Sequence, residues 1–253
     1  MTAASFVIPP ELVTLLREAQ HVAILTGAGT SAESGVPTFR EAQTGLWAQY
    51  DPQQLATPEA FQRNPRLVWE WYTWRRELVN KAQPNPGHVA LVTMEQRLPL
   101  FTLITQNVDG MHQRAGSQRV IELHGNINRT KRWNDGAIVE HWHETGASST
   151  PRCPETGSML RPDVVWFGET LPEAALAAAI EAAQMCDLFF SIGTSGVVQP
   201  AASLPMMAQR QETPVVVINP DVLPLTSATL YRIQGTSGQV LPALVQAAWP
   251  DAV

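Results

Sequence analysis

Short, nearly continuous apolar runs recur along the chain, and each ends in small or polar residues. The runs cover residues 22–27, 100–107, 120–125, 187–195 and 214–220. Apolar runs of this length are typical of parallel strands that are covered on both faces. Segments with a helical pattern lie between them, at residues 65–82, 87–98, 172–186 and 200–210. Strands that alternate with helices predict a doubly wound α/β sheet.

Two segments interrupt this alternation. Residues 40–64 are rich in Gln, Pro and aromatic side chains and predict a loop with short helical pieces. Residues 126–162 contain many Gly, Ser, Thr, Pro and charged residues and predict a small inserted module or an extended loop.

Polar residues stand at the ends of the apolar runs and not in their middles. In an open parallel sheet, ligands bind beyond the carboxyl ends of the strands. We therefore expect one crevice to be lined by Gly27, Gln106, Asn107, His124, Gly193, Thr194, Ser195 and Asn219. A neutral imidazole at His124 would act there as a general base near pH 7, although a lone histidine is more often structural.

The first run leads into the glycine-rich segment GAGTSAESGVPTFR, residues 27–40. Gly27 and Gly29 permit a tight turn that brings backbone N–H groups to a phosphate, and a helix starting near Thr30 would point its positive end there. Gly35 comes too late for the G-x-G-x-x-G spacing, so a hydride-transfer dinucleotide site is a poor match. The alternative is a purely structural turn. Arg40 is expected to lie against the ligand.

Two further polar clusters follow strands. In TQNVDG, residues 105–110, the side chains of Gln106 and Asn107 can contact a ribose or a carboxamide. Asp109 can cap a helix over residues 110–115. In GTS, residues 193–195, backbone donors and hydroxyls are available, and Asn219 suits a ribose or an adenine edge. Each cluster alone is equally consistent with a loop and a helix cap.

Length and composition exclude several classes of protein. The chain has 253 residues, of which 44% are hydrophobic, enough for one large α/β domain with a packed core. The net charge of −6 argues against a nucleic-acid partner. No apolar run approaches the roughly 18 residues of a membrane helix. The first basic residue is Arg17 and no secretory signal is evident, so we expect a cytoplasmic protein with no membrane partner.

Taken in order, these motifs resemble those of the sirtuins, the NAD-dependent protein-lysine deacylases. The matching pieces are GAGTSAESGVPTFR, TQNVD, HG at 124–125, FGE at 167–169, GTSGVVQPA and IN. They run from about residue 10 to the C-terminus. The resemblance implies one catalytic domain over 1–253, with a Rossmann-like part at 10–40, 84–125 and 168–253 and a small part at 41–83 and 126–167.

The resemblance also implies a reaction that consumes NAD as a co-substrate. The acyl oxygen of an acyl-lysine attacks the nicotinamide ribose carbon, and a base then activates a ribose hydroxyl. The acyl group is thereby transferred to ADP-ribose, which gives nicotinamide, free lysine and O-acyl-ADP-ribose. The catalytic residues implied are His124, the base, with Asn107 and Arg40.

Binding residues are implied by the same matching. The NAD-binding set is Gly27, Ala28, Gly29, Thr30, Phe39, Arg40, Trp47, Gln106, Asn107, Asp109, Gly193, Thr194, Ser195, Asn219 and Ser237. The substrate segment is Val164, Val165, Trp166, Phe167 and Gly168, which would pair with a peptide backbone as an added strand. The expected partners are acylated-lysine proteins or peptides, bound by a monomer.

Two features resemble the desuccinylase and demalonylase branch. Thr38 stands where many deacetylases have Asp, and Tyr72 and Arg75 match a Tyr-x-x-Arg pair. Residues at i and i+3 share a helix face, and a phenol with a guanidinium can grip a carboxylate. The alternative is an amphipathic helix in which Tyr72 packs and Arg75 is solvated.

The chain departs from the family at the usual structural zinc. The four cysteine positions hold Arg132, Asp135, Cys153 and Thr156, so a four-thiolate site cannot form and no zinc is expected. A rival interpretation places a metal among Asp135, His141, His143 and Cys153. Cys186, the other cysteine, is expected in the core. Asp163 also departs, since the branch usually has His there.

Two other functions stay open at this point. One is a different NAD-cleaving activity, either ADP-ribosyl transfer or NAD hydrolysis. The other is a non-enzymatic sensor of NAD or ADP-ribose. The substrate-type FGE segment at 167–169 speaks against the first, and the complete set of catalytic-type residues speaks against the second.

Overall fold

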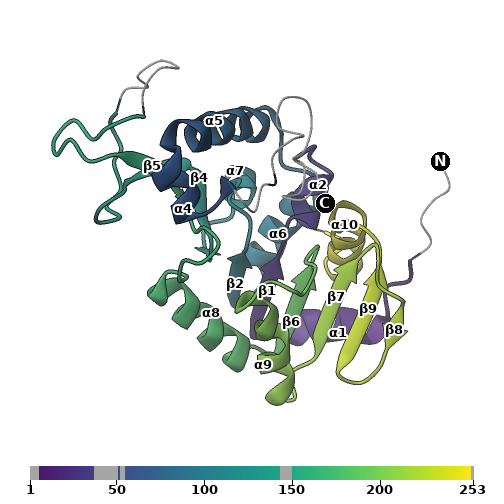
Figure 1. Ribbon diagram of the computed structural model, residues 1–253. Coiled ribbons are helices and arrows are strands. Elements are labelled where there is room, and N and C mark those ends of the chain that lie inside the picture. The colour runs from purple at the N-terminus through teal and green to yellow at the C-terminus, as the bar shows by residue number, and fades with distance from the viewer. Residues whose placement is uncertain (1–5, 37–50, 52–54, 143–149, 252–253) are drawn as a thin grey trace.

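The computed structural model describes residues 6–36, 51, 55–142 and 150–251. Within these residues the main sheet has seven strands in the order β3-β2-β1-β6-β7-β9-β8 (Figure 1). The strands are β1 (His21–Thr26), β2 (Leu100–Thr105), β3 (Val120–Glu122), β6 (Leu188–Ile192), β7 (Val215–Asn219), β8 (Leu225–Thr226) and β9 (Leu230–Gln234). In the described part of this sheet, every neighbouring pair is parallel except β8–β9. The predicted doubly wound, Rossmann-like α/β sheet is confirmed.

The strand order reverses direction at β1. The chain passes from β1 to β2 and β3 on one side, and then places β6, β7 and β9 on the other side. Thr26 at the end of β1 is aligned with Ile192 at the end of β6. The loops that follow these two strands therefore start side by side, at the position where doubly wound sheets bind their ligands.

Helices cover both faces of this sheet. One face carries α1 (Pro10–Glu18), α6 (Pro86–Arg97) and α10 (Ser237–Ala248), whose apolar side chains form one core with the strands. The other face carries α8 (Glu173–Met185) and α9 (Leu204–Arg210), which follows a short 3-10 helix at Ala201–Ser203. Figure 1 shows α8 and α9 in front of the sheet and α1 behind it. Among the described helices, none combines the length and apolarity needed to cross a bilayer.

Alanines let α8 lie close to the sheet. Ala179, Ala182 and Ala183 are buried against apolar strand residues such as Phe189. Cys186 ends this helix inside the same core, and burial raises the pKa of its thiol to about 12. The expectation that Cys186 is a core residue is confirmed.

A second core lies beside the sheet and is built largely from aromatic side chains. Its elements are α4 (Pro58–Arg63), α5 (Pro65–Lys81) and the antiparallel pair β4 (Gly125–Arg132) and β5 (Leu160–Val164), at the upper left of Figure 1. Side chains of Thr57 and Asn64 accept hydrogen bonds from the first turns of α4 and α5, which sets where these helices begin. Phe61, Trp69 and Trp166 fill the space between helices and strands.

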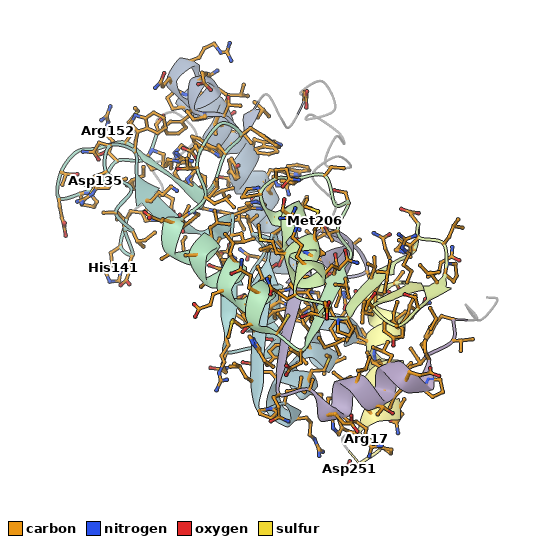
Figure 2. The ribbon with its side chains drawn as sticks, turned by 90° about the horizontal axis from the view of Figure 1, so that it is seen from below. Arg17, Asp135, His141, Arg152, Met206 and Asp251 are labelled. Carbon is orange, nitrogen blue, oxygen red and sulfur yellow. The ribbon has the colours of Figure 1, made fainter. Side chains whose placement is uncertain are left out.

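The four positions that the resemblance aligns with zinc-binding cysteines lie together at the edge of this second core, where only Cys153 is buried. Arg132 and Asp135 form a two-pronged ion pair, with N–O distances of 2.9 and 2.8 Å. The Cys153 thiol contacts Thr156 and Arg132, and these contacts lower its pKa. Figure 2 shows Asp135 and His141 at one end of the molecule, opposite Arg17 and Asp251. Among the described residues, no three His, Cys, Asp or Glu side chains are grouped to hold a metal, and His143 lies outside those residues.

A buried pair of histidines joins α6 to α7 (Met111–Ala115). The rings of His88 and His112 are 4.9 Å apart. His88 accepts a hydrogen bond from the Asn85 N–H at its Nδ1 atom, and His112 Nε2 lies 2.9 Å from the Thr26 hydroxyl. Burial lowers the pKa of His88 to about 4 and that of His112 to about 3. Both rings are therefore neutral at pH 7.

We predict that chelators leave the stability of the protein unchanged. Loss of a structural zinc costs folding free energy, but Arg132 and Asp135 already neutralise each other where the first thiolates would stand. Thermal unfolding with and without EDTA should give the same Tm, and the purified protein should contain no stoichiometric zinc by mass spectrometry. A fall in Tm of several degrees, or one zinc per chain, would contradict this expectation.

We also predict that the buried histidines make the protein acid-sensitive. The unfolded chain binds protons on His88 and His112 near pH 6.5, whereas the folded protein binds them only near pH 4 and 3. The unfolded state therefore binds more protons below pH 6.5, and the free energy of unfolding should fall by on the order of 3 kcal/mol between pH 7 and 5. Urea unfolding at several pH values measures this slope. His112→Asn should flatten it, whereas the exposed His141→Gln should not; an equal slope in both variants would refute the assignment.

Candidate active site

The loop after β1 packs directly against the loop after β6. A side-chain carbon at Gly27 would lie 2.8 Å from the Gly193 carbonyl oxygen, and one at Gly29 would lie 2.8 Å from the Gly193 Cα atom. The Gly27 N–H donates to the Ile192 carbonyl at 3.0 Å, and the Gly29 N–H donates to the Gly193 carbonyl at 2.8 Å. Gly27 and Gly29 are thus needed because the backbones of the two loops are in contact, which leaves no room for a side chain. The N–H groups of Gly27 and Gly29 are used between the two loops, and the approach of other backbone N–H groups of this segment to a phosphate stays a prediction.

The helix predicted after this loop is shorter than expected. α2 (Gly29–Ala32) has four residues, so its dipole is that of a single turn and offers little attraction to a phosphate. Ala28 is exposed at its start, whereas Thr30 is buried and its hydroxyl donates to the Ile192 carbonyl. Four residues predicted from this segment lie outside the described residues: Thr38, Phe39, Arg40 and Trp47.

Polar groups at the ends of four strands form one chain of hydrogen bonds. His124 Nδ1 lies 2.8 Å from the Gln106 carbonyl oxygen. The Gln106 side chain donates to the Thr194 hydroxyl at 3.1 Å, and the Asn219 amide donates to the Thr194 carbonyl at 3.0 Å. The structure thereby brings together the residues expected to line one crevice, with Ser195 exposed beside them.

The bond to Gln106 sets the state of the His124 ring. A carbonyl oxygen can only accept, so Nδ1 carries the hydrogen and Nε2 of the neutral ring keeps its lone pair. Burial lowers the pKa of His124, and the bond to Gln106 opposes part of that shift. The ring is therefore neutral at pH 7, with a basic nitrogen available. This is the form that a general base requires.

Asn107 and Asp109 lie deeper, next to Ser31. The Asn107 amide donates to the Gly27 carbonyl at 3.0 Å and to the Ser31 hydroxyl at 3.2 Å, which leaves its side-chain oxygen to accept. Asp109 accepts from the Met111 N–H at 2.9 Å, so it caps α7 as anticipated. Burial raises the pKa of Asp109, and its bonds to Met111 and Ser31 act in the opposite direction.

Ser237 begins α10 and is buried beside the glycine loop. Its hydroxyl lies 3.2 Å from the Glu33 carboxylate, which also accepts from the Thr236 hydroxyl at 2.7 Å and from the Gly238 N–H at 2.7 Å. An acidic group is favourable at a helix N-terminus. Glu33 was not singled out from the sequence, because its partners lie 203 to 205 residues away.

The substrate segment at residues 164–168 is anchored through its backbone. The Val165 N–H donates to the His124 carbonyl at 2.9 Å, and the Phe167 N–H donates to the Ala56 carbonyl at 2.9 Å. The Trp166 N–H donates to the Glu169 carboxylate at 2.8 Å. Phe167 is 46% exposed, and Gly168 has a φ of +88°, which ends the extended segment.

A buried arginine supports this segment and was missed from the sequence. Arg161 binds both oxygens of Glu169, at 2.5 and 2.9 Å, and donates to the Val164 carbonyl at 2.9 Å. Its guanidinium carbon lies 3.4 Å from the centre of the Trp166 ring. The signal available was an arginine in the segment LRPDVVWFGE, eight residues before the carboxylate of the FGE motif.

Ion pairs also join β3 to β5. Arg129 binds Glu122 at 2.6 Å and Asp163 at 2.9 Å, and Lys131 binds Asp163 at 3.2 Å. Because β3 ends at Glu122, two residues before His124, this network ties the chain just before the imidazole to β5 through the cationic side chains of β4. Asp163, the departure noted in the sequence, therefore has two cationic partners.

Tyr72 and Arg75 lie inside the second core. Tyr72 is 1% exposed, and its hydroxyl oxygen accepts a hydrogen bond from the Trp166 indole at 2.9 Å. Arg75 is 8% exposed, and its guanidinium carbon lies 5.2 Å from the centre of the Trp71 ring. The alternative of a solvated arginine is wrong. Burial raises the pKa of Tyr72 to about 12 and lowers that of Arg75.

Comparison with known proteins identifies the family. Residues 27–200 match the Sir2 family. An NAD-dependent protein deacylase of Methylococcus capsulatus is 47% identical over 245 residues, which cover 94% of this chain and 96% of that protein. A Sir2 homolog–NAD complex superposes with a TM-score of 0.89 at 42% identity, covering 98% and 96% of the two chains. For Sir2 bound to acetylated peptide the TM-score is 0.81 at 32% identity, covering 93% and 96%. The matched segment spans the glycine loop, His124 and the substrate strand, and the chain belongs to the Sir2 family.

Proposed function

We propose that this protein removes acidic acyl groups, succinyl and malonyl, from lysine side chains of proteins or peptides. The enzyme is an NAD-dependent protein deacylase, and NAD is its co-substrate. The observation that carries the acyl preference is the burial of Tyr72 and Arg75 side by side on one face of α5. Acetyl groups are a second substrate class.

NAD supplies the ADP-ribose that accepts the acyl group, so the products are nicotinamide, free lysine and O-acyl-ADP-ribose. In this reaction His124 Nε2 takes the proton of a ribose hydroxyl, since Nδ1 is held protonated by the Gln106 carbonyl. The Asn107 side-chain oxygen accepts from a ribose hydroxyl or the nicotinamide amide, since both amide hydrogens bond to the protein. Thr194, Ser195 and Asn219 hold the adenosine half.

The acyl carboxylate is held by Tyr72 and Arg75. A guanidinium that is 8% exposed is costly to bury, and a ligand carboxylate offsets that cost with charge-assisted hydrogen bonds. The Tyr72 phenol keeps its proton at neutral pH, since burial raises its pKa to about 12, and it therefore donates to a carboxylate without repelling it. An acetyl group offers no charged oxygen to either residue.

The peptide lies along residues 164–168. The N–H groups of Val165, Trp166 and Phe167 already bond within the protein, so an added strand bonds to the remaining backbone groups of this segment. The exposed Phe167 ring offers apolar contact beside it. Roles for Phe39, Arg40 and Trp47 in NAD binding, a monomeric state and a cytoplasmic location stay predictions.

We predict that His124→Ala lowers the rate of O-acyl-ADP-ribose formation by about 100-fold or more, because a general base contributes roughly 10²–10⁴-fold. Nicotinamide exchange should be affected less, since the bond to nicotinamide breaks before the base acts. His141→Gln, at an exposed position outside the proposed site, is the matched control. Mass spectrometry of both products measures the outcome, and turnover equal to that of the unaltered protein would refute the role of His124.

Acyl preference is tested with matched succinyl-, malonyl- and acetyl-lysine peptides. We expect the acidic peptides to react best, and Arg75→Met to lower the ratio of succinyl to acetyl kcat/KM by about 10- to 100-fold, the equivalent of one charge-assisted hydrogen-bonding group. Arg66→Met, at an exposed position of the same helix, should leave the ratio unchanged. If only the acetyl peptide reacts, the proposed preference for acidic acyl groups is refuted, whereas the deacylase activity is not. Nicotinamide release without any acyl peptide would point to NAD hydrolysis instead.

A further inference from the structure

Trp166 bonds to Tyr72 through its indole nitrogen, in addition to the bonds of its backbone. The indole Nε1–H donates to the Tyr72 hydroxyl oxygen at 2.9 Å, and both groups are buried. This bond joins the substrate strand, which carries Trp166, to α5, which carries Tyr72. An indole N–H can only donate, so the direction of the bond is fixed.

The direction of this bond decides what the Tyr72 hydroxyl does next. A phenol oxygen accepts through its lone pairs and donates one hydrogen. Trp166 fills an acceptor position, so the Tyr72 O–H must point elsewhere. Among the described residues no acceptor for that hydrogen lies within hydrogen-bond distance. A buried donor without an acceptor is unfavourable, and a ligand oxygen placed there removes that cost.

Trp166 is itself held in place. The guanidinium of Arg161 lies over its ring at 3.4 Å, and the Phe61 ring lies 5.3 Å from it. Glu169 accepts the Trp166 backbone N–H at 2.8 Å and binds Arg161 through both oxygens. The indole is therefore restrained through its ring and its backbone, so its N–H presents a fixed direction to Tyr72.

We propose that Trp166 is a positioning residue for acyl selection, which turns the Tyr72 hydroxyl hydrogen toward the carboxylate of the bound acyl group. This inference rests on the proposed preference for acidic acyl groups. The carboxylate then accepts from Tyr72 and from the Arg75 guanidinium. An acetyl group ends in a methyl group, which cannot accept a hydrogen bond from Tyr72. Trp166 should therefore affect binding of the acidic substrates only.

Trp166→Phe tests the proposal, since phenylalanine keeps an aromatic ring beside Arg161 and loses the N–H. The kcat and KM values are measured with succinyl- and acetyl-lysine peptides at saturating NAD. We expect the succinyl KM to rise about tenfold more than the acetyl KM, the size of one hydrogen bond to a charged group. Trp133→Phe is the control for lost aromatic area, since the ring centres of Trp133 and Trp166 are 6.3 Å apart. It should leave the ratio of the two KM values unchanged.

A double-variant cycle separates this role from a merely structural one. If Trp166 acts through the Tyr72 hydroxyl, Trp166→Phe should not change the acyl ratio further in a Tyr72→Phe background. Should Trp166→Phe fail to fold, 3-benzothienylalanine incorporated at position 166 keeps the shape of the side chain and removes the N–H, with the same expected result.

The outcomes are distinct. A selective rise in the succinyl KM that vanishes in the Tyr72→Phe background supports the proposal. In a second outcome, the unaltered enzyme prefers succinyl peptides while Trp166→Phe keeps the ratio of succinyl to acetyl KM, or loses both activities equally. Either result overturns the role of Trp166 and leaves the proposed acyl preference standing. An unaltered enzyme that prefers acetyl peptides overturns the proposed acyl preference, and this inference with it.

Discussion

The close approach of two backbones at the switch point of the sheet is the constraint on which the site depends. Gly27, Gly29 and Gly193 leave no room for side chains, and their hydrogen bonds join the loop after β1 to the loop after β6. From this contact outward, Gln106 reaches Thr194, and the Gln106 carbonyl holds the ring of His124. A bulky residue at any of the three glycines would separate the strand ends, and the polar chain that crosses them would be broken.

A second layer of the site belongs to the aromatic core and not to the sheet. Its charged members are buried with compensating partners: Arg161 has Glu169 and the face of Trp166. Since a buried charge is tolerated only when it is paired and hydrogen-bonded, such pairs mark positions where geometry matters. The two layers are joined by the backbone bond from the Val165 N–H to the His124 carbonyl and by the ion pair of Arg129 with Glu122.

The sequence predicted five of the seven strands described in the main sheet, because continuous apolar runs such as 22–27 and 187–195 mark buried strands, and it missed β8 and β9. It also placed the strand-end residues in one crevice, since parallel strands must end together. It did not predict β4 and β5, whose mixed polar sequence pairs through an irregular register between Asn126 and Thr130. It also missed α10, with Pro242 in its interior. Glu33 and Arg161 were missed because their partners become neighbours only after folding, and no local pattern encodes that. Zinc dependence and the roles of individual site residues stay predictions.

The Glu33 carboxylate has a consequence for the order in which this protein is made. The groups that Glu33 binds, at residues 236–238, follow it in the chain by more than 200 residues, so they are synthesised well after it. The glycine loop likewise waits for Gly193. A chain synthesised only as far as β2 can pair β1 with β2, but the loop after β1 still lacks its contacts with Gly193 and with residues 236–238. The crevice can therefore assemble only after residue 238 has been synthesised, much later than the first strand pair of the sheet.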